Sequence, residues 1–215
     1  MKKVLILGDS LTLPRFKPES CKHEDTWPVL LQDYFDVHAI SIGGGTIKDL
    51  HRQLEYHIAY KPDYVIIQSG IVDCAPRALG LLELEVMQQF WVTKRLVLPI
   101  VRKQSKYLRG FRNKTYTTPR DFASYLQKIR MQLGAVEMFS IGILPSCPEY
   151  EIIVPGVTKR VKQFNEILKN LFQENFIPTD TIDRAGIMSD HIHLNKDGHQ
   201  FIFNSVRSFL GNKAC

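Results

Sequence analysis

The chain has 215 residues, of which 44% are hydrophobic and 23% charged, with 13 glycines and 11 prolines. These proportions are those of an ordinary globular protein, and a chain of this length buries roughly 70% of its unfolded surface without disulfides or metals. They exclude a disordered chain, a collagen-like repeat, a coiled coil and a small disulfide scaffold.

Short apolar runs, each ended by a small or helix-breaking residue, predict the strands of a parallel sheet. In chain order these are residues 3–7, 37–42, 64–68 and 136–144, with a weaker fifth at 176–182. Gly8, the glycine turn 43–45, Gly70 and Pro145 stand at the ends of the first four runs.

Amphipathic stretches between these runs predict helices. They cover residues 27–34, 46–56, 120–133, 158–172 and 197–210. Thr118 and Pro119 form a start signal for the third helix, and Gly211 a stop signal for the last. Strands that alternate with helices favour an α/β domain in which helices cover both faces of a parallel sheet.

Residues 75–117 interrupt this alternation, and we expect a helical insertion there that Pro99 breaks or kinks. Within it and just beyond, residues 86–120 contain nine Lys and Arg and no Asp or Glu, although the whole chain sums to only +6. The remainder of the chain therefore carries −3. An anionic partner would meet the protein at this insertion.

The basic insertion has three interpretations. The first is a solvated helical cover over a functional site. The second is a cationic face that attracts an anionic substrate, such as a diphosphate-linked sugar or an acyl carrier. The third is a helix on a membrane surface, because apolar side chains are interleaved with the basic ones: Phe90, Trp91, Leu96, Leu98, Ile100 and Val101. Nucleic acid is disfavoured as a partner, since no groove-reading motif accompanies the charge.

The termini and the cysteines bear on the compartment. The apolar run at residues 4–8 is shorter than the about 7 to 15 residues of a secretory signal, and no run approaches the roughly 18 of a membrane span. Cys21, Cys74, Cys147 and Cys215 are scattered without a CxxC pair. We therefore expect a cytoplasmic protein with reduced thiols, no metal and no cofactor. No feature of the sequence predicts an oligomeric state.

Ligands of an open parallel sheet bind beyond the carboxyl ends of its strands. The first predicted strand ends in Gly8-Asp9-Ser10-Leu11, and the second is followed by Gly44 and Thr46. A third group of residues lies near the C-terminus: Asp190, His193, Leu194, Asn195, Gly198 and His199. In these blocks the chain resembles the GDSL, or SGNH, hydrolase family, whose first block it matches outright.

The resemblance implies a fold and a set of roles. The expected fold is a single three-layer α/β/α domain over residues 1–215, with a flavodoxin-like sheet of order 2-1-3-4-5 and the helical insertion within it. Ser10 stands where the family has its nucleophile, with His193 as its base and Asp190 as the group that orients the histidine.

The family stabilises the oxyanion with three donors: the N–H of the serine, the N–H of the second-block glycine and an Asn side chain in the third block. Ser10 and Gly44 match the first two, but the third block reads Gly70-Ile71-Val72-Asp73 and Val72 cannot donate. One missing donor costs about 2.7–4 kcal/mol of transition-state stabilisation. Arg77 is our candidate for a replacement donor or a clamp for a substrate anion.

Several neighbouring residues have structural interpretations. We expect Asp9 to shape the turn after the first strand and His191 to be a bystander on its loop. His199 is expected to be a partly buried structural histidine on the last helix, and Cys74 a small buried residue.

The implied activity is hydrolysis of a carboxylic ester, and the substrate favoured by analogy is an O-acyl or O-acetyl group on a carbohydrate or glycoconjugate precursor. An O-acyltransferase that uses the same three residues is the first alternative. A binding module for an anionic ligand, which keeps the fold without catalysis, is the second, and Val72 is its main support.

Overall fold

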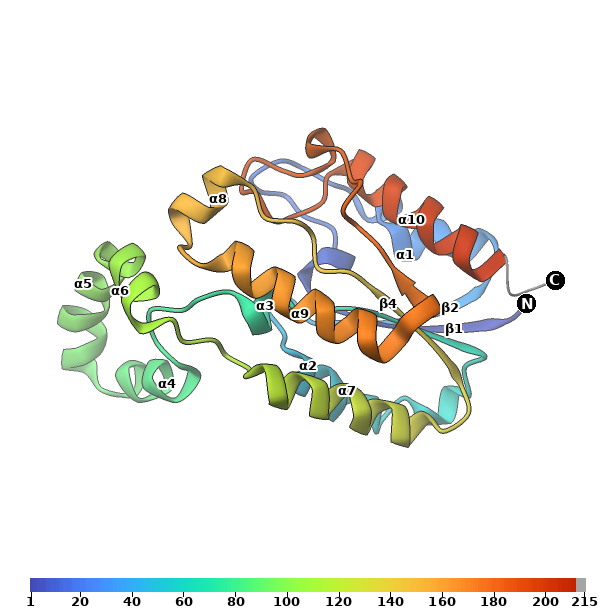
Figure 1. Ribbon diagram of the computed structural model, residues 1–215, viewed down its shortest axis with the longest axis horizontal. Coiled ribbons are helices and arrows are strands. Elements are labelled where there is room, and N and C mark those ends of the chain that lie inside the picture. Colours follow the sequence, from blue (N-terminus) through green and yellow to red (C-terminus); the bar gives the residue numbers. More distant parts are fainter. Residues whose placement is uncertain (212–215) are drawn as a thin grey trace.

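The computed structural model describes residues 1–211, apart from the side chain of Arg102, and contains one five-stranded sheet (Figure 1). All its neighbouring strands are parallel, and their order is β2-β1-β3-β4-β5, as predicted. The strands are β1 Lys3–Gly8, β2 Asp36–Ser41, β3 Tyr64–Gln68, β4 Glu137–Ile141 and β5 Phe176–Ile177. Gly8 at the end of β1 pairs with both Ser41 and Gln68, so the carboxyl ends of β1–β3 lie along one edge.

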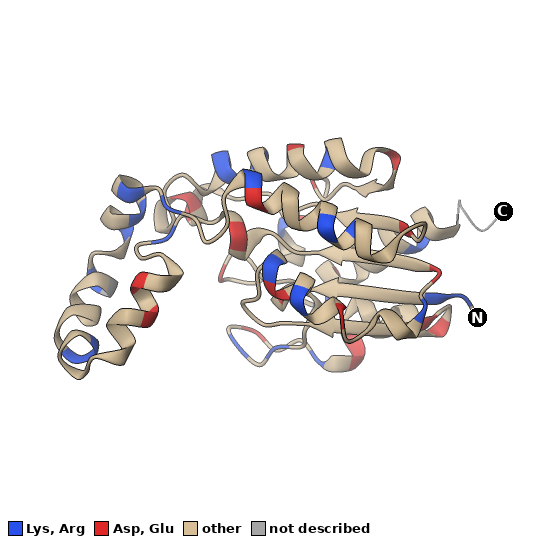
Figure 2. Ribbon diagram, turned by 90° about the horizontal axis from the view of Figure 1, so that it is seen from below, with Lys and Arg blue, Asp and Glu red and all other residues tan. Residues whose placement is uncertain are grey.

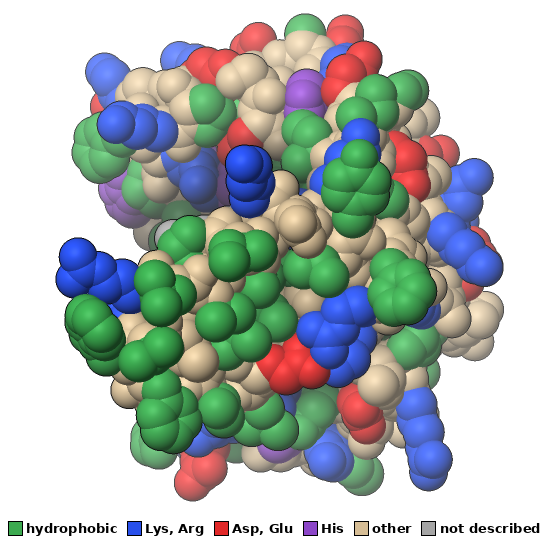
Figure 3. Space-filling view, turned by 90° about the vertical axis from the view of Figure 1, so that its left-hand side faces the viewer, with side chains coloured by type: hydrophobic (Ala, Val, Ile, Leu, Met, Phe, Trp, Pro, Cys, Tyr) green, Lys and Arg blue, Asp and Glu red, His purple; other side chains and the backbone are tan. Residues whose placement is uncertain are grey.

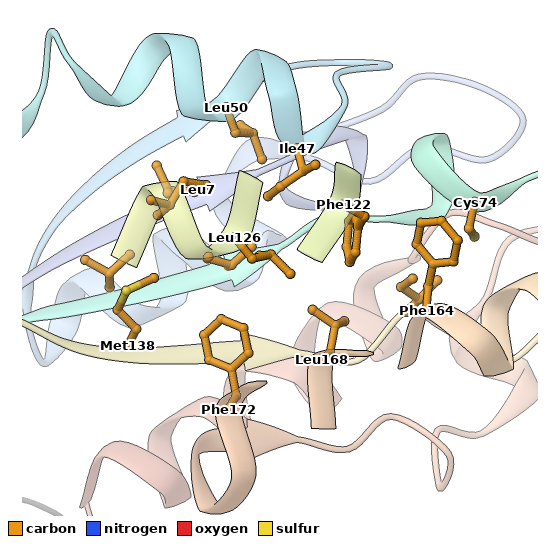
Figure 4. Close-up of a cluster of buried hydrophobic side chains, with 14 of the residues drawn as sticks. Leu7, Ile47, Leu50, Cys74, Phe122, Leu126, Met138, Phe164, Leu168 and Phe172 are labelled. Atoms are coloured by element: carbon orange, nitrogen blue, oxygen red, sulfur yellow. The ribbon is translucent and has the colours of Figure 1, made fainter. Parts of the chain in front are cut away.

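The side chains of the interior strand β1 alternate between two buried clusters, which makes the fold three-layered. Leu5 and Leu7 pack with helices α2 Ile47–Leu54, α7 Pro119–Leu133 and α9 Val157–Phe172 (Figure 4). Val4 and Ile6 pack on the opposite face with α1 Trp27–Leu30 and α10 Lys196–Gly211.

Two helices begin where the sequence predicted, because each has a side-chain cap. Thr46 and Asp49 form a capping box: the Asp49 carboxylate accepts from the Thr46 N–H at 2.9 Å, and the Thr46 hydroxyl from the Asp49 N–H at 3.4 Å. At α7 the Thr118 hydroxyl accepts from the Asp121 N–H at 3.1 Å, with Pro119 in the first turn. The first of these caps starts α2 directly after the glycine turn, at the edge where the site lies.

Other elements differ from the predicted bounds. Helix α1 is a single turn followed by the 3-10 turn Leu31–Asp33, and α10 continues through Gly211. Strand β5 has two residues, because Pro178 follows it and has no N–H for the ladder. The short helices α3 Ile71–Cys74 and α8 Pro148–Ile153 were not predicted. The other 3-10 turns are Ser10–Thr12, His23–Asp25, Ile58–Tyr60, Gln173–Asn175 and Arg184–Gly186.

Residues 81–112, which we call the helical projection, extend away from the sheet beyond its carboxyl edge (Figure 1). They form α4 Leu81–Gln89, the π turn Thr93–Val97, α5 Leu98–Lys103 and α6 Ser105–Arg112. The break expected at Pro99 falls instead at Phe90, which is extended. Pro99 lies in the first turn of α5 after the wider π turn, and there the chain tolerates its missing N–H.

The projection carries both basic and acidic residues (Figure 2). Glu83 on α4 partly neutralises its positive charge. Its carboxylate accepts from Arg112 at 2.5 Å and from Lys114 at 2.6 Å. These hydrogen bonds lower the pKa of Glu83 to about 2. Glu83 precedes the acid-free segment of the sequence, so the count of nine cations overstates the charge that a partner meets.

The two chain segments that connect the projection to the core are bonded to each other, which holds the two ends of the projection together. The Arg77 N–H donates to the Lys114 carbonyl at 2.7 Å, which forms an isolated antiparallel bridge.

Cys21, Cys74 and Cys147 are free thiols, whereas Cys215 lies outside the described residues. None of the helices within residues 1–211 has the length and apolar character needed to cross a bilayer.

Candidate active site

Ser10 is separated from β1 by Asp9 alone and begins the 3-10 turn at the carboxyl edge of the sheet. Asp9 is fully buried, and its Oδ1 accepts from the Leu11 N–H at 2.9 Å, so it shapes the turn as expected. A Cβ at Gly8 would lie 2.3 Å from the Thr12 side chain, which leaves no room for a larger residue. The turn therefore packs tightly and holds Ser10 in place just beyond the end of β1.

Asp190 and His193 lie on the loop between the turn Arg184–Gly186 and α10. The Asp190 Oδ1 accepts from the N–H groups of Ile192 and His193, both at 3.0 Å, which folds the loop around the carboxylate. Its Oδ2 lies 2.6 Å from Nδ1 of the His193 ring, and the Nε2 of that ring lies 3.0 Å from the Ser10 Oγ. The structure thus brings together three residues that are up to 183 positions apart in the sequence.

Burial and hydrogen bonds together determine the protonation states of His193 and Asp190. Burial lowers the pKa of His193 below 6.5, although the hydrogen bond and the charge of Asp190 act in the opposite direction. Burial alone would raise the pKa of Asp190, but the hydrogen bonds from His193 and Ile192 hold it below its usual value. At neutral pH the ring is therefore neutral: Nδ1–H donates to Asp190, and Nε2 can accept the proton of Ser10.

A cavity of about 500 Å³ opens at this edge, and five of the six predicted site residues line it: Ser10, Gly44, Val72, Arg77 and His193. The sixth, Asp190, is not part of the lining and bonds to the His193 ring. Gly44 has φ +72°, a conformation that side chains with a Cβ rarely adopt. No hydrogen-bond acceptor within the described chain takes the N–H of Ser10 or of Gly44, so both are free for a ligand.

Val72 lies on α3, is only 8% exposed and brings an apolar side chain into the cavity. Next to it, the Arg77 Nη2 donates to the Val72 carbonyl at 3.2 Å. The departure of this chain from the family pattern therefore falls inside the cavity, with a guanidinium as its neighbour.

Asp73, whose side chain is the polar one in the third block, is fully buried and does not line the cavity. Its carboxylate accepts from the Ile47 N–H at 3.1 Å and from the Thr117 hydroxyl. Burial raises the pKa of Asp73 to about 7, although these hydrogen bonds act in the opposite direction. Asp73 ties α2 and the end of the insertion to α3, which fixes the position of Val72.

Three charged or aromatic residues of the cavity were missed by the sequence analysis: Arg15, Tyr116 and Tyr150. Tyr150 comes from α8, which follows the end of β4, so the rule that ligands bind at strand ends could have indicated it. Arg15 and Tyr116 lie on irregular segments, and no local pattern marks them.

His191, His199 and Cys74, which we expected to be structural, lie outside the cavity. His191 has φ +69°, and its ring lies against Arg184 rather than Ser10. His199 is fully buried and accepts from the Trp27 N–H at 3.3 Å, and burial lowers its pKa to about 4. Cys74 is fully buried, and burial raises the pKa of its thiol.

Gly198 determines how closely the loop that carries His193 can approach α10. A Cβ at Gly198 would lie 2.1 Å from the Gly186 carbonyl oxygen, which is backbone and cannot move aside alone. We expect Gly198→Ala to lower the free energy of unfolding by about 1–3 kcal/mol, measured by urea denaturation. Gly211→Ala is the matched control, because a Cβ there meets nothing within 4 Å. Equal stability of the two variants would contradict the prediction.

Fold and site together define the class. A parallel sheet of order β2-β1-β3-β4-β5 with serine and histidine at its carboxyl edge has the arrangement of an α/β hydrolase of the SGNH fold. The model of the GDSL-like lipase/acylhydrolase family matches residues 6–201. The chain belongs to this family and is an ester hydrolase of the GDSL type.

Solved structures share this fold across nearly the whole chain at low sequence identity. A lipase/acylhydrolase from Enterococcus faecalis is 16% identical with a TM-score of 0.68, covering 99% of this chain and 97% of its own. A GDSL-family lipolytic protein from Desulfitobacterium hafniense is 16% identical with a TM-score of 0.62, covering 97% and 99%. A mutant acetylxylan esterase from Geobacillus stearothermophilus is 18% identical with a TM-score of 0.60, covering 98% and 94%. No curated protein sequence is detectably similar to the chain.

Proposed function

We propose that the protein hydrolyses a carboxylic ester through an acyl-enzyme on Ser10, with His193 as base and Asp190 as the group that orients it. The observation that carries the proposal is the pair of contacts of the His193 ring, 3.0 Å to the Ser10 Oγ and 2.6 Å to Asp190. A nucleophile, its base and the orienting carboxylate have the geometry that covalent ester hydrolysis requires.

The reaction follows from these positions. The Ser10 Oγ attacks the ester carbonyl carbon while its proton passes to the His193 Nε2. As the tetrahedral intermediate collapses, the C–O bond to the alcohol breaks and the alcohol leaves with that proton. Water then attacks the acyl-enzyme and gives its proton to Nε2; on collapse, Nε2 returns the proton to Ser10 and the carboxylic acid leaves.

The oxyanion is stabilised by the free N–H groups of Ser10 and Gly44, both of which belong to cavity residues. The third donor of the family pattern is absent at Val72. We therefore expect slower turnover than in relatives with Asn at this position, by roughly a hundred- to a thousandfold.

The test is intact-mass analysis after exposure to a fluorophosphonate. Stoichiometric labelling of the wild type at Ser10, lost in His193→Ala, would support a working nucleophile and base. If the wild type stays unlabelled and cleaves no ester, the proposal fails, and the alternative of a binding module with the fold of a hydrolase takes its place.

The lowered pKa of His193 predicts the pH dependence of catalysis. A protonated ring cannot accept the proton of Ser10, so activity is expected to rise with pH as His193 loses its proton and to be level near neutrality. The midpoint of kcat/KM against pH should lie below 6.5, the usual value for histidine. A midpoint above this value would contradict the prediction and indicate that Asp190 outweighs burial.

For the substrate we propose an O-acyl or O-acetyl group on a carbohydrate or glycoconjugate precursor. One support is that a structural relative is an acetylxylan esterase. An O-acyltransferase would form the same acyl-enzyme but pass the acyl group to a sugar hydroxyl. Product analysis with and without acceptor sugars separates the two, because only a transferase yields an acylated acceptor.

For the location we propose the cytoplasm, as expected from the sequence, and the free thiols of Cys21, Cys74 and Cys147 support this.

We further propose that the helical projection rests on an anionic lipid surface. Its exposed face is apolar and aromatic (Figure 3), with the side chains of Leu82, Val86, Phe90, Trp91, Leu96 and Ile100 more than half exposed. Exposed basic side chains without a described carboxylate partner are interleaved with them: Lys94, Arg95, Lys103 and Lys106. This charge favours anionic headgroups over a second copy of the same basic surface.

Co-sedimentation with vesicles tests this surface. The protein is expected to bind vesicles that contain phosphatidylglycerol and to dissociate from them in high salt. It should not bind vesicles of pure phosphatidylcholine. Trp91→Ala should weaken binding severalfold, whereas Tyr56→Ala, which removes an exposed aromatic side chain outside the projection, should not. The absence of vesicle binding would contradict the proposal, and a stable dimer in light scattering would identify a second copy as the occupant instead.

A further inference from the structure

The cavity that contains Ser10 and His193 is positively charged. Arg15 and Arg77 line it, and no Asp or Glu of the described chain does. A neutral ester needs no such charge, and guanidinium groups in a cleft attract and orient carboxylates and phosphates.

Arg77 is held in a defined position. Its Nη2 donates to the Val72 carbonyl at 3.2 Å, and its backbone N–H donates to the Lys114 carbonyl at 2.7 Å. The Cζ of its guanidinium lies over the Tyr116 ring, 4.5 Å from the ring centroid, and Tyr116 lines the same cavity. An arginine fixed in this way loses little further side-chain entropy when it binds a ligand.

Arg77 also lacks a counter-charge. Its Nε is buried without a hydrogen-bond partner, as is the Nε of Arg109, which lies beside Arg77 and Tyr116 in an adjoining groove. Neither guanidinium forms an ion pair with a carboxylate within residues 1–211. Burial and the charge of Arg77 both lower the pKa of Arg109. Two adjacent cations without an anion are unfavourable, and a bound anion would relieve this.

We infer that the substrate is an ester that carries its own anionic oxygen group, a carboxylate or a phosphate, and that Arg77 binds this group with Arg15 lining the same cavity. The inference rests on the proposed function and names the substrate class of that site. Arg77 is a specificity residue here, because it contacts a part of the substrate that does not react.

Matched acetate esters test the inference. 4-Acetoxybenzoate carries a carboxylate and 4-acetoxyphenylphosphonate a phosphonate, whereas methyl 4-acetoxybenzoate is neutral. The ratio of kcat/KM for each anionic ester to that for the neutral one cancels general losses of activity. Comparison of the two anionic esters distinguishes carboxylate from phosphate recognition. The ester whose ratio falls more when Arg77 is replaced is the better mimic of the natural substrate.

Arg77→Gln is expected to lower this ratio about tenfold or more, whatever its effect on the neutral ester. Arg77→Lys should restore part of the ratio, and Arg15→Gln should lower it less. Arg207→Gln is the matched control, because Arg207 also stacks on a tyrosine, Tyr34, at 4.2 Å but lies outside the cavity. Equal loss on neutral and anionic esters, or an unchanged ratio, would overturn the inference.

A binding measurement separates this inference from the proposed function. Ser10→Ala should bind 4-acetoxybenzoate in calorimetry, and Ser10→Ala/Arg77→Gln should bind it at least about tenfold more weakly. If fluorophosphonate labelling and turnover both fail in the wild type while this Arg77-dependent binding persists, the subsite stands and the hydrolase mechanism does not. If Ser10→Ala binds none of the anionic esters, the subsite is wrong whatever the labelling shows.

Discussion

Replacement of His193 by Ala is expected to lower kcat for ester hydrolysis by about a thousandfold or more, and Ser10→Ala by a similar factor. The proposed base, His193 Nε2, lies 3.0 Å from the Ser10 Oγ, and without a base the hydroxyl keeps its proton. Because the two residues act as one unit, the double variant should lose little more than either single variant. Steady-state rates with 4-nitrophenyl acetate measure all three.

His191→Asn is the matched control for that loop. His191 has φ +69°, which Asn tolerates better than most residues, and its ring contacts Arg184 outside the cavity. We expect its activity to stay within about twofold of the wild type, since surface changes away from a site have small effects. If His193→Ala retained more than a tenth of the wild-type rate, another group would have to be the base.

The second large effect is a gain of activity. Val72→Asn places a donor at the third-block position, where the side chain lines the cavity with Ser10 and Gly44. One additional oxyanion donor contributes about 2.7–4 kcal/mol, so kcat should rise by roughly a hundred- to a thousandfold. The increase should appear in kcat more than in KM, because the donor acts on charge that develops only in the transition state.

Val72→Leu is the control, since leucine has nearly the shape of asparagine and no donor. Thermal melts should show both variants folded, because the Val72 side chain lines the cavity, which leaves room for a somewhat larger side chain. An unchanged kcat in Val72→Asn would contradict the prediction. It would mean that another group already fills the role of the missing donor, and Arg77, bonded to the Val72 carbonyl, would be the first to replace in that background.

The class of the fold could be predicted from local sequence. Apolar runs closed by Gly8, Gly70 and Pro145 are too short for buried helices, and the helical patterns between them require parallel crossovers. Parallel strands present their carboxyl ends at one edge, so residues that follow strands, such as Ser10 and Gly44, could be assigned to one site before any coordinates were known.

Element bounds and charge could not be predicted as well, because they depend on neighbours distant in the chain. The interruption of the projection fell at Phe90 rather than Pro99, since a π turn accommodates the proline. The acid-free run 86–120 suggested nine unpaired cations, but Glu83 folds back onto Arg112 and Lys114. Local composition carries no information about such pairings.

The sequence alone therefore determined the chemistry that is available: a serine after the first strand, an aspartate and a histidine just before the last helix, and a valine where a donor is expected. Only the tertiary structure decided how these groups are used. It set the 3.0 and 2.6 Å contacts of His193, buried its ring enough to keep it neutral, and brought Arg15, Tyr116 and Tyr150 into the cavity. Distance, burial and cavity lining arise from packing between segments far apart in the chain, and a local pattern cannot encode them.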